Sequence, residues 1–267
     1  MDSQLAVILA LTFVIHLIGT LAYAFRIAGV RTGHLAIAFS LFNSLVLISR
    51  LSNAFQGPLL AKRVELAIAG SVTEALRHDL MLVLVAASAA TLAGGVLLPS
   101  FQRMATVSVA HFHRRRSMLK LLRRTLSPAG VSAMLRAATL PRYATLRGAL
   151  AVTDLPLLVI GLNFAATALW TVGVLASVYA GVITPELRVT AASLSSLVNG
   201  VATIVMFVFI DPHVSAMTDD AASGRSSEGH LRRLIFWMVA SRFAGTLAAQ
   251  ALLVPSAAVI AKVAEVL

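Results

Sequence analysis

The sequence predicts an all-α, polytopic membrane protein with about six transmembrane helices and a basic cytoplasmic loop that carries interfacial helices. Its mean hydropathy is +0.88 over 267 residues, and hydrophobic residues make up 58% of the chain against 12% charged residues. A water-soluble domain of this length does not need so much apolar surface. The net charge of +11 would suggest nucleic acid in a soluble protein. In a membrane protein, basic cytoplasmic loops explain it, so we expect no nucleic-acid partner.

Six segments are apolar enough to cross a bilayer, which takes about 20 residues per helix. The chain starts with Asp2 and has no early basic residue, which favours a retained first helix over a cleaved signal peptide. The second segment is short and ends on Arg50, and the long sixth segment has a possible break at Pro255. We therefore expect one integral-membrane domain over residues 1–267. Its expected spans are 5–25, 35–51, 80–98, 155–182, 189–210 and 234–263.

The basic residues predict the orientation. Residues 101–154 contain ten Lys and Arg and one acid. With this loop in the cytoplasm, the cytoplasmic loops hold 15 Lys and Arg and the opposite side holds six. The positive-inside rule then places both termini outside.

Within this loop, apolar residues of 118–126 cluster on one helical side and predict a helix on the inner leaflet. The segment is either a topology anchor alone or a surface that collects anionic membrane lipids. Leu59 to Arg77 is a second amphipathic segment, at the outer interface or re-entrant, and Asp211 to Arg233 resembles a polar connector.

An arginine inside the last span is the most informative feature. Arg242, Thr246 and Gln250 are four residues apart, so they share one face of a helix. No Asp or Glu lies deep in any of the six expected spans, so Arg242 has no evident counter-ion. Guanidinium groups bind phosphates through paired hydrogen bonds. Two interpretations stay open: a phosphate site, or an arginine that bonds helix carbonyls or snorkels to the headgroups.

A second patch has the same composition. In "SRLSNAFQGP", Arg50 precedes Asn53 and Gln56, and a proline follows. Near an interface, Arg50 has the same two interpretations. His16 in the first span is either a packed core residue or a proton relay. The residues predicted to bind a diphosphate or polar headgroup are Arg242, Arg50, Gln250, Asn53, Gln56, Thr246, Arg26 and Arg31.

Signatures of enzymes are missing. The chain has no cysteine and contains no H-E-x-x-H, G-x-S-x-G or G-x-x-x-x-G-K-[ST] motif. His111 and His113 form an H-x-H, but no acid or cysteine stands near them to complete a metal site. We therefore expect no catalytic residue, no cofactor and no bound metal.

Two blocks of the sequence resemble a known family. "AFRIAGVRTGHLAIAFSLFNSLVLISRLSNAFQGPLLAK", Ala24 to Lys62, resembles the first conserved block of the Amj family, the alternate lipid II flippases of bacteria. "SRFAGTLAAQALLVPSA", Ser241 to Ala257, resembles its closing block, and together with length and span number the likeness covers most of the chain. Leu51 stands where the family has threonine, so the match in the first block is incomplete.

The resemblance implies a function in cell-wall biogenesis and cell shape. It implies movement of lipid II, the undecaprenyl-diphosphate-linked peptidoglycan precursor, from the inner to the outer leaflet of the bacterial cytoplasmic (inner) membrane. Lipid II is then the partner, and the family supplies no set of functional residues.

Three other functions remain open on the residues alone. They are an exporter of small hydrophobic compounds, an integral-membrane enzyme acting on polyprenyl phosphates, and a structural membrane subunit. The missing metal ligands and nucleophiles count against the enzyme.

Overall fold

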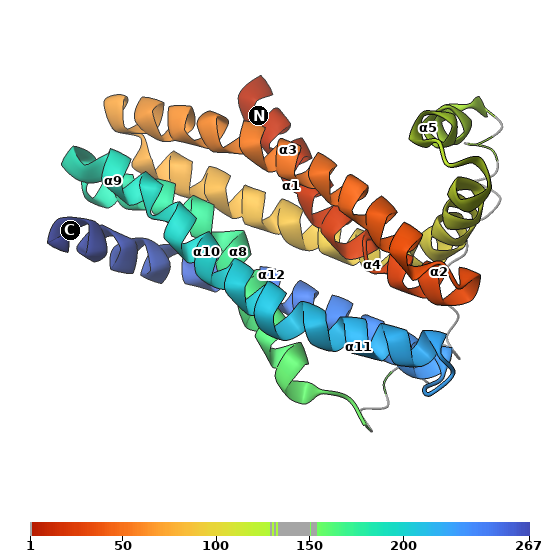
Figure 1. Ribbon diagram of the computed structural model, residues 1–267. Coiled ribbons are helices and arrows are strands. Elements are labelled where there is room, and N and C mark those ends of the chain that lie inside the picture. Colours follow the sequence, from red (N-terminus) through yellow and green to blue (C-terminus); the bar gives the residue numbers. More distant parts are fainter. Residues whose placement is uncertain (1, 129, 131, 133–149, 151–153) are drawn as a thin grey trace.

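Six long helical segments form an elongated bundle, which confirms the expected fold class (Figure 1). The computed structural model describes residues 2–128, 130, 132, 150 and 154–267, and this part of the chain contains helices and no strand. All six segments are long and apolar enough to cross a membrane. Their ranges are Ser3–Thr32, Leu35–Ala69, Thr73–Arg115, Leu157–Ile183, Pro185–Ala222 and Glu228–Val266.

The first span consists of two helices in series, α1 (Ser3–Leu21) and α2 (Ala24–Thr32). Asp2 caps α1, because its Oδ1 accepts a hydrogen bond of 2.7 Å from the backbone N–H of Leu5. That bond, together with the nearby Arg63 guanidinium, lowers the pKa of the Asp2 carboxyl. The polar start of the first span is therefore capped and joined to the second span through Arg63.

The second span is longer than its apolar stretch indicates. Helix α3 (Leu35–Ala69) continues past Arg50 and through Pro58. Its last turns are held by Arg63, which pairs with Asp2 at 2.8 Å and with Asp79 at 2.6 Å. Residues 59–77 are therefore not the separate amphipathic segment that the sequence suggested: they end α3, turn at 70–72 and begin the next helix.

The third span extends into the expected basic loop. Helix α4 (Thr73–Arg115) runs well beyond the expected end at residue 98, so residues 101–115 are helical rather than loop. A short helix, α5 (Met118–Leu126), follows, as the amphipathic pattern predicts. Most of the remaining loop, with Arg136, Arg142 and Arg147, lies outside the described residues.

The second half of the chain contains the other three spans. Helix α8 (Leu157–Ile183) is followed by a fifth span made of several pieces and by α12 (Glu228–Val266). The pieces of the fifth span are η1 (Pro185–Leu187), α9 (Arg188–Ser193), α10 (Ser195–Ile204), the π-helix η2 (Val205–Ile210) and α11 (Asp211–Ala222).

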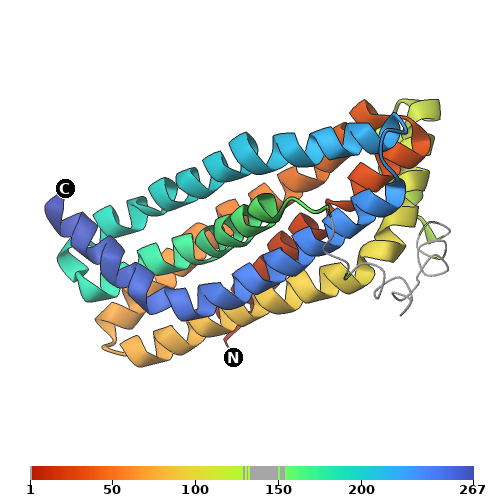
Figure 2. The same ribbon diagram turned by 90° about the horizontal axis from the view of Figure 1, so that it is seen from below.

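Two expectations for this half need correction. The polar connector expected from Asp211 to Arg233 is instead mostly helical, and only residues 223–227 separate α11 from α12. Helix α12 is not broken at Pro255 but continues to Val266, and Figure 2 shows it change direction toward its C-terminus. A proline without an N–H removes one helix hydrogen bond, which is a common cause of such a bend.

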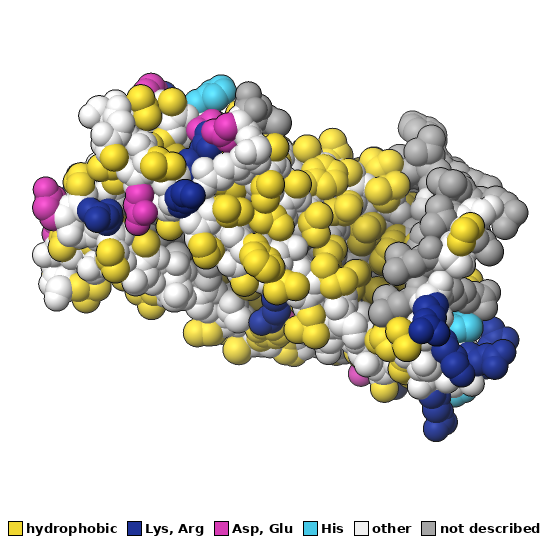
Figure 3. All heavy atoms as spheres, turned by 90° about the horizontal axis from the view of Figure 1, so that it is seen from above, with side chains coloured by type: hydrophobic (Ala, Val, Ile, Leu, Met, Phe, Trp, Pro, Cys, Tyr) yellow, Lys and Arg dark blue, Asp and Glu magenta, His cyan; other side chains and the backbone are white. Residues whose placement is uncertain are grey.

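The core is built mainly by four of the helices. Helix α1 packs chiefly against α4, and α8 packs chiefly against α12, while α12 also contacts α4 and so joins the two halves. Helix α3 and the fifth span are the least buried of the six. Figure 3 shows a broad hydrophobic face between two ends that carry most of the visible charged side chains, with a basic side chain also visible near the middle, as expected for a membrane protein with an arginine in a span.

The two ends of the bundle differ. The C-terminus, the α3–α4 turn and α9 lie at one end, and the N-terminus lies about midway along the bundle (Figures 1 and 2). The α2–α3 turn, α5 and the α11–α12 connection lie at the opposite end. We call this opposite end the basic end, because α5 and the His–Arg-rich end of α4 belong to it.

Candidate functional site

A small polar cavity lies where α1, α3, α4 and α8 meet. Its volume is about 30 Å³, and its polar lining comes from Thr12, His16, Asn53, Gln56 and Thr171. The side-chain amide of Gln56 donates a hydrogen bond of 2.6 Å to the hydroxyl of Thr12. Nδ1 of His16 is buried and has no hydrogen-bond partner among the described residues. The structure therefore brings three predicted site residues, His16, Asn53 and Gln56, into one pocket.

Arg242 of α12 lies close to this region, beside residues one and two turns after His16. Its guanidinium lies against Gly19, where a Cβ atom would collide with the Arg242 Nη2, and it interacts with the hydroxyl of Tyr23. It also lies within electrostatic range of His16. Its Nε is buried without a hydrogen-bond partner in the described part of the chain. Arg242 and the small cavity thus share His16 as a common neighbour.

A hydrogen-bonded side-chain amide holds the turn of α12 that precedes Arg242. Nδ2 of Asn163 in α8 donates to the backbone oxygen of Met238 at 2.9 Å and to Oγ of Ser241 at 2.8 Å. Oδ1 of the same amide accepts from the Tyr23 hydroxyl at 3.3 Å. Asn163 belongs to α8, and its partners belong to α12 and to the α1–α2 junction. One side chain therefore holds three segments together. Asn163 therefore positions Ser241, which precedes Arg242 in the chain, and Tyr23, whose hydroxyl interacts with the guanidinium.

The predicted stripe on α12 does not form a single site. Gln250 instead donates to the hydroxyl of Ser88 in α4 at 3.0 Å. Thr246 is buried and bonds the backbone oxygen of Phe243 in its own helix at 2.7 Å. Of the three stripe residues, only Arg242 is placed beside α1.

Arg50 lies in the middle of a span and not at its end. It is 15 residues from Leu35 and 19 from Ala69, which puts it about 22 Å along α3 at 1.5 Å per residue. Its side chain is exposed. Neither Arg50 nor Asn53, one turn away, has an ion pair or hydrogen bond with any described residue. The helix thus presents free hydrogen-bond donors near the middle of its length.

Arg26 and Arg31 belong to the basic end and are already paired. Arg26, only 4% exposed, donates to Asp211 and to the hydroxyl of Ser215, both at 3.0 Å. Arg31 pairs with Glu228 at 3.0 Å. Asp211 therefore lies inside the helical fifth span, one residue beyond the end expected at 210.

The sequence carried a signal for two residues that the predicted set leaves out. Thr12, His16 and Tyr23 follow one another at helical spacing of four and seven residues, so they share a face of the first span. That polar stripe could have identified Thr12 and Tyr23. Nothing in the local sequence identifies Asp211 as the partner of Arg26, because the two are 185 residues apart.

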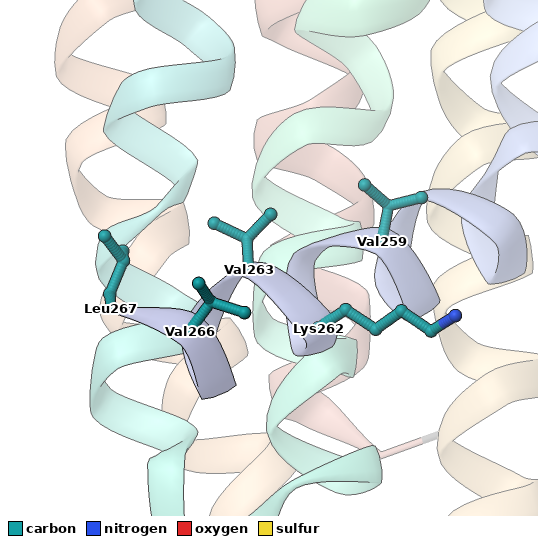
Figure 4. A pocket seen from close by; sticks show the side chains of 5 residues that line it. All are labelled: Val259, Lys262, Val263, Val266 and Leu267. Atoms are coloured by element: carbon teal, nitrogen blue, oxygen red, sulfur yellow. The ribbon is translucent and has the colours of Figure 1, made fainter.

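A recess at the end of α12 does not suit a headgroup. It has a volume of about 330 Å³ and is lined by four residues of α12 and the adjoining Leu267, whose side chains project along one helix without enclosing a site (Figure 4). Among the described residues, no group of three His, Cys, Asp or Glu is placed to hold a metal ion. His113 instead stacks on His34, with ring centroids 3.7 Å apart.

Comparisons with known proteins cover nearly the whole chain. The model of the family described as Amj, Alternate to MurJ, matches residues 11–264. The protein named Lipid II flippase Amj from Bacillus subtilis (strain 168) is 35% identical over 266 residues, which cover 97% of this chain and 96% of that relative. No solved structure matches.

Proposed function

Because this chain belongs to the Amj family, we propose that it is a lipid II flippase, as its Bacillus subtilis relative is named. It moves the undecaprenyl-diphosphate-linked precursor from the inner to the outer leaflet of the bacterial cytoplasmic membrane. The six apolar segments and the relative's name support a multi-pass transporter rather than a catalyst.

One observation carries the proposed mechanism. Arg50 and Arg242 both lie at mid-span, and neither forms an ion pair with a carboxylate among the described residues. A cation at this depth is costly unless an anion or a wet cavity compensates it. The diphosphate of lipid II supplies that anion, and each guanidinium offers the fork of donors that suits it. Asn53, Gln56 and His16 provide further polar contacts for the headgroup beside them.

The headgroup requires the helices to separate. A cavity of about 30 Å³ holds little more than one water molecule, whereas lipid II carries a disaccharide and a peptide. The two halves must therefore move apart during transport, while the polyprenyl tail stays in the surrounding lipid. This is the rocking expected of transporters whose site lies at the midplane between two bundles.

The basic end faces the cytoplasm in this proposal, and both termini face outward. The excess of Lys and Arg in residues 101–154 supports this orientation through the positive-inside rule. In that orientation, α5 lies near the anionic inner leaflet, where each basic residue contributes about 1 kcal/mol of attraction. Anionic lipids, lipid II among them, then gather at the end where transport begins.

The test is exposure of lipid II at the outer surface. A bacterium depleted of its own flippases receives this chain, and an externally added lipid II-cleaving enzyme reports access to the precursor. We expect the wild-type chain to restore cleavage. Arg242→Ala should reduce it by about tenfold to a hundredfold, because hydrogen bonds between charged groups contribute about 1.5–3 kcal/mol each.

The matched control is Arg77→Ala. Arg77 is an exposed arginine that pairs with Glu74 of its own helix, so its loss should leave cleavage unchanged. No cleavage with an inserted wild-type chain would refute the substrate. Normal cleavage by both Arg242→Ala and Arg50→Ala would refute the diphosphate site alone.

A further inference from the structure

The ion pairs between the two halves of the chain are all at one end. Arg26 of α2 pairs with Asp211, at the start of α11, and Arg31 of α2 pairs with Glu228, at the start of α12. Every other ion pair of the described residues joins partners within the same half. The contact between the halves at the opposite end is apolar, with Leu60 and Leu80 in the same buried cluster as Leu175 and Leu253. Among the described residues, the ion pairs between the halves are therefore specific to the basic end.

The segment held by these two arginines is a helical hairpin. Helix α11 is joined by residues 223–227 to the first turns of α12, and we call residues 211–232 the basic-end hairpin. Its inner face is apolar: Val214 is 1% exposed and lies in the same hydrophobic cluster as Ile27 and Ala28 of α2. On its other side, a recess of about 460 Å³ separates α11 and α12 from the chain that enters α8. The hairpin is thus tightly packed on one side only.

A change of helix type lies where the hairpin begins. Residues Val205–Ile210 form a π-helix, and Pro212 follows in the first turn of α11. π-helical turns are rare and concentrate at functional sites, and a proline removes a hydrogen-bond donor. Both features lower the resistance of the fifth span to bending at this point. The hinge therefore immediately precedes Asp211, the residue that Arg26 holds.

We propose that the basic-end hairpin is the cytoplasmic gate of the transporter, hinged at the π-helix and held shut by Arg26 and Arg31. Asp211 and Glu228 occupy the arginines as internal anions while the gate is closed. The diphosphate of the incoming lipid competes with these carboxylates for the guanidinium groups, and the exchange frees the hairpin to swing toward the recess. The anion's identity rests on the proposed function, whereas the hinge and the two clasps do not.

The first test needs no transport. The chain has no cysteine, so a single Val214→Cys is the only thiol. Labelling with a water-soluble maleimide should be slow in the wild-type background. The labelling rate should rise by about tenfold or more with Asp211→Asn and Glu228→Gln, because removing the carboxylates leaves the buried Arg26 and the exposed Arg31 without their partners on the other half and favours the open state.

Ala191→Cys is the matched control for labelling. Ala191 lies in the same span, is 0% exposed and belongs to the opposite end of the bundle. It should stay protected in both backgrounds, which excludes general unfolding. Equal labelling of Val214→Cys in the two backgrounds would overturn the gate, whatever the transported lipid is.

The second test locks the gate. A short thiol-specific cross-linker with a disulfide in its spacer joins Arg31→Cys to Glu228→Cys in proteoliposomes that contain lipid II. Transport should fall by about tenfold or more and recover when a reductant cleaves the cross-link, because closure then no longer depends on exchangeable charges. The matched pair is Glu74→Cys with Arg77→Cys, an Arg–Glu pair within α4 whose cross-link does not join the halves.

The outcomes separate the two proposals. Full transport by the locked 31–228 variant overturns the gate. If the wild-type chain does not move lipid II in the same proteoliposomes, the function proposed above fails, and the Val214 labelling decides the gate without it.

Discussion

Replacement of Gly245 by alanine tests how closely α12 must approach α8. A Cβ atom at this position would lie 2.7 Å from the backbone oxygen of Phe164, 3.0 Å from Cβ of Thr167 and 3.2 Å from the backbone nitrogen of Ala168. Ordinary van der Waals contact begins near 3.4 Å, so the helices must separate by about 0.7 Å. Two of the three obstacles are backbone atoms, which cannot move aside as a side chain does.

The separation of α12 from α8 determines how much stability and transport the Gly245→Ala substitution should remove. Overpacking of a tight helix contact costs about 1–3 kcal/mol, and in a membrane such contacts are the main stabilising term between helices. Arg242 lies one turn before Gly245, so the same movement shifts the guanidinium relative to α1. A displacement of this size in a binding group should reduce transport by about tenfold.

Stability is measured by titrating the purified protein from mild detergent into SDS. The two tryptophans, Trp170 in α8 and Trp237 in α12, report on this pair of helices by fluorescence. The matched control is Gly161→Ala in α8, where nothing lies within 4 Å of an added Cβ atom. Alanine there should stabilise the protein by about 0.4–1 kcal/mol, because it restricts the unfolded chain.

The two substitutions should change the free energy of unfolding in opposite directions. If Gly245→Ala is as stable as Gly161→Ala, α12 does not approach α8 as closely as the structure indicates. If Gly245→Ala is destabilised but transports normally, the contact holds the bundle without positioning Arg242.

Two further substitutions test the surroundings of Arg242. Gly19→Ala puts a methyl group where the Arg242 Nη2 lies, so transport should fall toward the level of Arg242→Ala. The SDS midpoint should change little, because only the end of a flexible side chain must move. Normal transport by Gly19→Ala would show that the guanidinium acts elsewhere. Asn163→Leu should lower stability by about 1–3 kcal/mol in the same titration, because buried partners of the amide lose their hydrogen bonds. Asn43→Leu is its control: Asn43 is exposed on α3, so a change beyond about 0.5 kcal/mol there would mean that the assay is not specific for the buried amide.

Several properties of the protein follow from the order of its residues alone. Runs of apolar residues predict the helical membrane class and the number of spans, because transfer into the bilayer is a sum over residues that are neighbours in the chain. The same reasoning identifies Arg242 as an arginine within a span. The likeness of residues 24–62 and 241–257 to the Amj family is also visible in the sequence, and the comparisons confirm the family.

The ends of the helices are not predictable in this way. Helix α3 extends to Ala69 because Arg63 finds carboxylates at Asp2 and Asp79, which makes a charged stretch compatible with a long helix. The fifth span likewise continues through Asp211 because Arg26 pairs with that carboxylate. A hydropathy pattern ends a span where the apolar residues end, whereas a helix continues wherever its polar groups have partners.

The amino-acid sequence alone thus specifies which segments lie in the membrane and which of their residues carry charge. Which of those charges are paired depends on the tertiary structure. Arg26 and Arg31 find carboxylates on the other half of the chain, whereas Arg50 and Arg242 find none among the described residues. The physical reason is that an ion pair depends on the rotation and tilt of two helices far apart in sequence, and packing against neighbours sets both.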